Sequence, residues 1–306
     1  METMRNHGGA ISLMSPIDLQ EGVASLSRGA YFKEASLSMT LSILTESAAQ
    51  MSGIERVSIW ALADGKQELR CLELFERSTA QHSSGIVLHA GDCPIYFQSL
   101  AGERNRASDD ASLLPGMAEL GAGYLAQHKI TARLDTPIYI RGELQGVLSF
   151  EQVGSHLPWT TAHRLFAHAV ANLVTLALVE YEAEEARLEA KTATERLRAV
   201  FDASRDALLL ADGESGVILD ANRQAEKLFG CKRRDLVGKD QRMLHPKASA
   251  LKIGDHFRQM VSGQRRGALL TEICRSDGSV LPVEITAEIA DISDGKRLAL
   301  GIFRQI

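Results

Sequence analysis

Few residues of the kinds that carry out chemistry stand at spacings that would let them act together. Four cysteines are scattered along the chain without a CxxC pair: Cys71, Cys93, Cys231 and Cys274. This distribution favours reduced thiols that pack as small apolar side chains over a metal or disulfide site. His163 and His168 are five residues apart on a predicted helix, so their rings diverge around its axis and a shared metal ion is not expected.

The patterns of common catalytic sites are also missing from the sequence. We find no Ser-His-Asp set, no carboxylates placed for acid-base work and no P-loop, and Asp109-Asp110 is better explained as loop charge. His245 precedes a proline, which favours an extended loop without a metal role. We therefore expect no catalytic and no metal-binding residues in this chain.

The composition indicates two soluble domains. A length of 306 residues with 45% apolar content is enough for two cores, and a net charge of -5 gives no basic field for nucleic acid or an anionic membrane. The longest apolar run, Ala169 to Val179, ends at Glu180 and is too short to span a bilayer. The N-terminus lacks the features of a signal peptide, so we expect a cytoplasmic protein.

In the first half, a tail over residues 1–25 precedes alternating helices and strand pairs. Apolar residues near a 3.6 period, including Phe32 and Leu44, predict a helix from Tyr31 to Met51. Turn residues at 64–65 and 141–143 predict two hairpins. Short helices are expected near 94–101 and 116–128, and the whole domain is placed at residues 26–178.

A long helix should follow, because neither Gly nor Pro occurs between Trp159 and Ala203. Two apolar series repeat on it at heptad a and d spacing: Leu176, Ala183, Ala190 and Leu197, then Val179, Ala186, Ala193 and Val200. Glu182 and Arg187 have the spacing that pairs two parallel chains. We expect a parallel homodimer with a coiled-coil linker at 179–198; a solvated single helix is the alternative, since alanine seams bury little area.

The second half, residues 199–306, predicts an antiparallel sheet. Strands flank a Gly turn within 206–222, and Asn222 stands where a cap would begin a short helix. A turn at Asp277-Gly278 leads into alternation of Val283, Ile285, Ala287 and Ile289 with polar residues, so one face of that strand should be buried.

Residues 196–306 resemble the PAS family through VFDASRDALLLAD, GVILDANRQAEKLFG, RRDLVGK, SDGSVLPVEI and LGIFRQI, in the family's order and spacing. Residues 31–181 resemble a GAF domain through VSIWAL, ERSTAQHSSGIVL, DCPIYFQSL and LDTPIYIRGELQGVLSFEQVG. The implied fold class is α+β, with two domains that each have an antiparallel sheet flanked by helices, joined by the long signalling helix.

The resemblance implies the sensory region of a bacterial signalling protein. Such a series usually precedes an output domain, and the stop at FRQI implies that one is cut off here. Family habit favours cyclic di-GMP turnover by a diguanylate cyclase or phosphodiesterase. The alternatives are the input of a sensor histidine kinase and a ligand-free dimerisation or docking scaffold.

The resemblance also bears on cofactors. Where flavin-adduct PAS domains carry a cysteine, residues 240–245 offer no thiol, and neither Cys71 nor Cys93 has the neighbouring histidine of bilin-binding GAF domains. The residue set of cyclic-nucleotide GAF domains is not found. Haem ligation through His256 is a weaker explanation of that residue than a surface histidine.

The expected signal is a small molecule of unknown identity, bound by the GAF or the PAS domain, or a redox change, passed on through the dimeric helix. Candidate wall residues of the GAF pocket are Tyr96, Phe97 and Tyr124. Candidates for the PAS pocket are Phe229, Leu244, Phe257 and Met260, with Asn222 to orient a polar ligand group. Ordinary core packing explains each of these residues as well.

Overall fold

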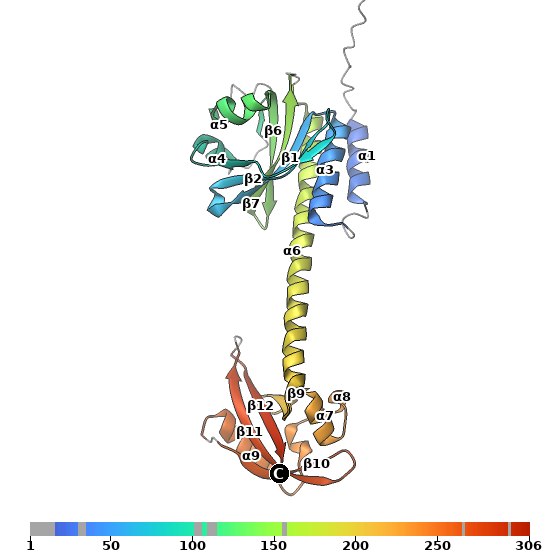
Figure 1. Ribbon diagram of the computed structural model, residues 1–306, viewed down its shortest axis with the longest axis vertical. Helices are drawn as coiled ribbons and strands as arrows, with labels where there is room; N and C mark the ends of the chain where they lie inside the picture. Colours follow the sequence, from blue (N-terminus) through green and yellow to red (C-terminus); the bar gives the residue numbers. More distant parts are fainter. Residues whose placement is uncertain are drawn as a thin grey trace, which may run out of the picture. The chain divides into compact units, whose positions relative to one another are not determined.

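The computed structural model describes residues 16–29, 35–100, 106–108, 115–154, 158–264, 267–292 and 295–306 (Figure 1). They form two compact units, the first ending at Ala186 and the second beginning at Arg187. The fold is α+β: each unit has one antiparallel sheet, and the long helix α6 (Thr161–Ala203) belongs to both.

The first unit is built on a seven-stranded antiparallel sheet in the order β3-β2-β1-β7-β6-β5, with β4 also paired to β2. Both predicted hairpins are present, as the pairs β1·β2 and β6·β7. The strands are β1 (Arg56–Ala63), β2 (Glu68–Glu76), β3 (Gln81–Ser83), β4 (Val87–His89), β5 (Arg106–Ser108), β6 (Ile130–Ile140) and β7 (Glu143–Val153).

Helices cover both faces of this sheet, which is why successive residues of β1 are buried on both sides. Figure 1 shows α3 and α6 on one side and α4 and α5 on the other. The helical segments are α1 (Pro16–Ser27), α3 (Leu37–Ser52), the turn η1 (Asp64–Lys66), α4 (Pro94–Leu100), α5 (Pro115–Leu120) and the π-helical η2 (Gly121–Leu125).

Two predictions for the N-terminal region need correction. The expected tail over 1–25 instead contains most of α1, whose Leu26 is buried in the core with α3 and α6. The helix expected from Tyr31 begins at Leu37, because Ser36 is extended and its hydroxyl accepts the Met39 amide as an N-cap. Residues 30–34 lie outside the described part of the chain.

The second unit has a five-stranded antiparallel sheet in the order β10-β11-β12-β8-β9. Its strands are β8 (Ala207–Asp212), β9 (Ile218–Ala221), β10 (Leu269–Cys274), β11 (Val280–Asp291) and β12 (Arg297–Gln305). Between β9 and β10 lie α7 (Arg223–Phe229), α8 (Arg233–Leu236), the turn η3 (Gln241–Leu244) and α9 (Ala250–Val261).

Helix α6 changes character along its 43 residues. Its first part buries apolar residues such as Phe166, Val170 and Val174 in the first core, whereas residues 179–191 are exposed. By length and composition α6 contains a window apolar enough to cross a membrane, which was not predicted from the longest apolar run. Because 39% of that window is buried and a core helix passes the same test, this is weak evidence for a span.

Candidate functional site

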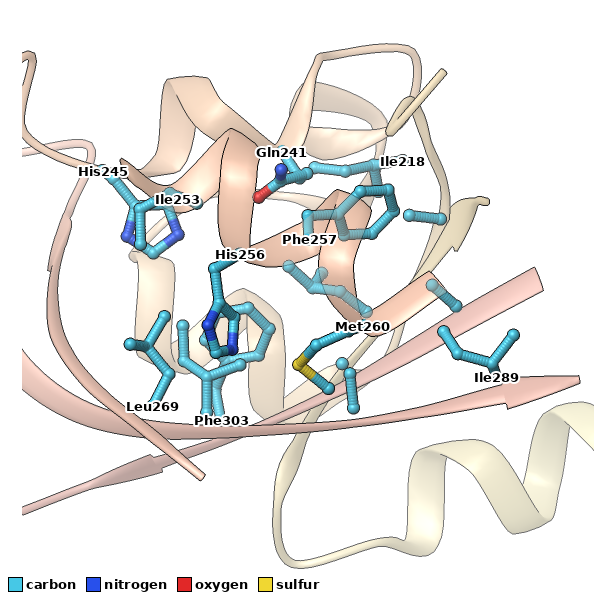
Figure 2. Close-up of a pocket in the computed structure, with 16 residues that line it drawn as sticks. Ile218, Gln241, His245, Ile253, His256, Phe257, Met260, Leu269, Ile289 and Phe303 are labelled. Carbon is cyan, nitrogen blue, oxygen red and sulfur yellow. The ribbon is translucent and has the colours of Figure 1, made fainter. Parts of the chain in front are cut away.

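The second unit contains a cavity of about 60 Å³ between α9 and the sheet (Figure 2). Helix α9 contributes Ile253, His256, Phe257 and Met260, which share one face at helical spacing. The rest of the wall consists of Leu209, Ala211, Ile218, Gln241, His245, Leu269, Ile285, Ala287, Ile289, Ala299, Gly301 and Phe303.

The cavity exists because the sheet presents small residues opposite α9. Ala211, Ala287, Ala299 and Gly301 leave room that longer side chains would fill. A side chain at Gly301 would also meet the Phe303 ring, since an added Cβ would lie 2.9 Å from it. Ile285, Ala287 and Ile289 line the same cavity because they alternate along β11 and so point to one face of the sheet.

Three polar side chains interrupt the apolar wall: His245, His256 and Gln241. The Nδ1 of His245 lies 2.7 Å from the main-chain oxygen of Glu272. A carbonyl oxygen only accepts, so Nδ1 carries the proton and Nε2 of the neutral ring is an acceptor. Burial lowers the pKa of His245, which favours this neutral form.

His256 was expected at the surface, and this expectation is wrong. It is 8% exposed, and Figure 2 shows its ring pointing from α9 toward the sheet beside Phe303 and Met260. His256 is buried because it belongs to the face of α9 that packs on the sheet. The volume nevertheless argues against haem, because about 60 Å³ holds only a few water-sized groups whereas pockets for drug-sized ligands reach about 300 Å³ or more.

The predicted PAS pocket residues fall into two groups. Phe257 and Met260 line the cavity. Phe229 and Leu244 do not; they are buried in the neighbouring core with Ala225 and Ile273. Both are therefore core residues.

The role proposed for Asn222 in orienting a ligand is wrong. Its side-chain oxygen accepts the amides of Leu208 and Ala225 at 2.9 and 2.8 Å, and its nitrogen donates to the carbonyls of Phe201 and Asp206 at 3.1 and 2.9 Å. These four bonds use its full capacity. The predicted cap of α7 is confirmed by the bond to Ala225.

In the first unit, the face of the sheet toward α4 and η2 carries a row of four charged residues, three of them buried, that were not among the predicted site residues. Glu76, Arg56, Glu151 and Arg133 lie opposite one another on the successive strands β2, β1, β7 and β6, so the charges alternate in sign. Glu151 accepts a hydrogen bond from Arg56 Nε at 3.0 Å and forms an ion pair with Arg133, whose Nη1 lies 3.1 Å away, and Arg56 also pairs with Glu76. Charged residues that alternate with apolar ones within the predicted strands were the sequence feature that could have revealed these ion pairs.

Two predicted GAF pocket residues contact this charged row. The Tyr96 hydroxyl accepts from Arg133 Nη2 at 3.1 Å and donates to Asp135, two residues along β6, at 2.8 Å. The Tyr124 hydroxyl donates to Glu151 at 3.2 Å. Burial raises the pKa of both tyrosines, which keeps their hydroxyls protonated. Phe97 is half-buried and packs edge-on against Tyr96, with ring centroids 6.2 Å apart.

Comparison with known proteins agrees with this architecture. A family model described as a GAF domain matches residues 36–178, and one described as a PAS domain matches residues 205–306. An uncharacterised protein of Azorhizobium caulinodans is 27% identical over 191 residues, which are 60% of this chain and 25% of that protein. The match thus spans about a quarter of that relative's length.

Solved structures of both kinds are similar to the chain. The PAS domain of a Colwellia psychrerythraea protein is 26% identical and covers 38% of this chain and 97% of its own, with a TM-score of 0.34. The GAF domain of a phosphoenolpyruvate-protein phosphotransferase from Coxiella burnetii is 15% identical and covers 56% of this chain and 99% of its own, with a TM-score of 0.46. On the matches to the two family models, the chain is a tandem GAF–PAS region, with a GAF domain at residues 36–178 and a PAS domain at residues 205–306.

Proposed function

We propose that this chain is the cytoplasmic input region of a bacterial signal-transduction protein, in which a small molecule bound by the PAS domain changes how two copies pair along α6. One observation carries the proposal. All eight residues of the predicted heptad seam lie on one continuous helix and all are exposed: Leu176, Val179, Ala183, Ala186, Ala190, Ala193, Leu197 and Val200.

The ends of this seam are its most apolar part. Leu197 and Val200 are each 73% exposed, and Leu176 is 42% exposed. Four alanines between them bury little area in a dimer, so pairing should be weak and easily biased. A signal worth a few kcal/mol is enough to invert the populations of two such arrangements.

The wall of the PAS cavity favours a ligand that is small, uncharged and largely apolar. The wall is mainly aliphatic and aromatic, and a buried charge would lack a partner of opposite sign among the residues that line it. His245 Nε2 is suited to accept one hydrogen bond from a ligand hydroxyl or N–H group.

Native mass spectrometry of the purified chain tests both parts, since one spectrum reports the oligomeric state and any retained small molecule. We expect a dimer that Leu197→Glu converts to monomer. The matched control is Leu188→Glu: Leu188 is 58% exposed on the same helix but occupies heptad position f, away from the seam. A wild-type monomer, or equal effects of the two variants, would contradict the seam.

The output that we propose is cyclic di-GMP turnover by a domain outside this chain. The only support for it is that GAF–PAS series commonly precede such domains. Incubating the full-length gene product with GTP should yield cyclic di-GMP if the output domain is a cyclase. If the domain is a phosphodiesterase, added cyclic di-GMP should instead be consumed. Phosphate transfer from ATP to a histidine would identify a sensor kinase instead.

A further inference from the structure

The Arg133 side chain of β6 is fully buried in a cage of three aromatic rings. Its guanidinium carbon lies 5.9 Å from the ring centroid of Trp60, 5.5 Å from that of Tyr96 and 5.6 Å from that of Tyr124. The three rings come from β1, α4 and η2, so three segments far apart in the sequence converge on one cation.

Polar groups complete the cage around the nitrogen atoms. Arg133 Nε donates to Asp135 at 2.8 Å, Nη2 donates to Ser149 at 2.9 Å and to Tyr96 at 3.1 Å, and Nη1 lies 3.1 Å from Glu151. Asp135 and Glu151 are themselves buried. Hydrogen bonds therefore satisfy Nε and Nη2, and an ion pair with Glu151 faces Nη1.

This combination of groups is selective for a guanidinium. Aromatic faces attract a weakly hydrated planar cation, and carboxylates at its edge match its forked N–H groups. An ammonium ion is compact and strongly hydrated, and cannot make the same set of contacts. Without a cation, Asp135 and Glu151 would lose a buried partner of opposite charge.

We propose that this face of the GAF domain is a guanidinium-binding site whose resident occupant is the chain's own Arg133. The domain is thus self-liganded: a separate molecule enters the cage only when the Arg133 side chain is removed. This inference does not depend on the function proposed above, but it assigns signal reception to the PAS cavity if that function is correct.

The test is chemical rescue of Arg133→Ala in the full chain. Both tryptophans, Trp60 and Trp159, lie in the GAF domain, so their fluorescence follows unfolding of that domain. We expect the variant to unfold roughly 10 °C below the wild type. Methylguanidinium at low millimolar concentration should raise the unfolding midpoint of Arg133→Ala in a saturable way. Sodium chloride and urea at equal concentrations should not.

The control is Arg70→Ala, which removes a largely exposed arginine from the same sheet and should show neither the loss nor the rescue. Wild-type stability in Arg133→Ala, or a folded variant without rescue, would overturn the proposal. If Arg133→Ala does not fold, the test uses Arg133→Lys. A thermal unfolding midpoint of this variant clearly below that of the wild type supports a guanidinium-specific cage, and an equal unfolding midpoint overturns it.

Discussion

Arg198, near the end of α6, donates to Asp220 of β9 at 2.8 Å and so joins the long helix to the PAS sheet. The same guanidinium bonds to both oxygens of Asp202, at 2.8 and 3.0 Å, and to the main-chain oxygen of Ala221 at 3.1 Å. One side chain therefore fixes the last turns of α6 against the strand that precedes α7.

Removing this junction should loosen the start of the PAS domain. Arg198→Ala loses bonds to two carboxylates, but the side chain is 35% exposed, so screening limits the expected cost to about 1–2 kcal/mol. Hydrogen exchange should accelerate in residues 199–222. Arg196→Ala, which changes an exposed arginine of the same helix, should leave exchange unchanged, and equal acceleration in both variants would argue against a specific junction.

A larger loss is expected from Asn222, because its side chain is fully buried and bonded four times. Asn222→Ala leaves buried backbone groups without partners and should destabilise the PAS domain by about 2–4 kcal/mol. Asn222→Asp should cost at least as much, because a carboxylate oxygen would face two carbonyl oxygens. Denaturant unfolding measures this, with the exposed Gln259→Ala as control; a change below about 1 kcal/mol would contradict the assigned role.

The PAS domain should lose stability in mild acid. Burial lowers the pKa of His245 in the folded state, so below about pH 6.5 the unfolded chain takes up a proton that the folded domain resists. Stability is therefore greatest above this pH and falls as the pH drops from about 7 toward 5.

The variant His245→Asn tests this assignment, because its amide can still donate to Glu272 but does not titrate. Its stability should vary less with pH than that of the wild type, and an unchanged slope would show that His245 is not the source of the dependence. His128 and His163 also have pKa values lowered by burial, but both lie in the GAF domain.

The four thiols should separate into two classes in a titration with a thiol reagent. Burial raises the pKa of Cys71 to about 12 and that of Cys93 to about 11, and both side chains are buried. Cys231 and Cys274 are half-buried and should react first, although burial also raises the pKa of Cys231. Two thiols should react quickly at pH 8 and all four after unfolding; rapid reaction of all four in the folded protein would be inconsistent with the buried positions.

Local signals in the sequence were sufficient for most of the fold. The turns at Asp64-Gly65 and Asp277-Gly278, the uninterrupted helix after Trp159 and the cap at Asn222 each depend on a few neighbouring residues. These features were predicted because turn chemistry, helix periodicity and capping act over short distances.

The sites were harder to predict because they depend on how distant residues meet. Arg133 and Glu151 pair because the register of β6 and β7 shifts by one residue between Ile138 and Tyr139, an irregularity that the predicted turn alone does not reveal. His256 was misplaced because its polar type favours the surface, although its spacing from Ile253 and Met260 puts it on the apolar face of α9. Asn222 was identified as a cap, but three of its four partners lie 14 to 21 residues earlier in the chain.

Because α6 is one continuous helix, the number of residues in it sets the rotation of one end about the helix axis relative to the other. Each residue added to an α-helix turns everything beyond it by about 100°, whereas seven residues restore nearly the same direction. One residue inserted among the exposed positions 181–191 would turn the end of the stripe at Leu197 away from the end at Leu176. Insertions or deletions of seven residues would keep the two ends nearly in phase and so preserve a single apolar stripe.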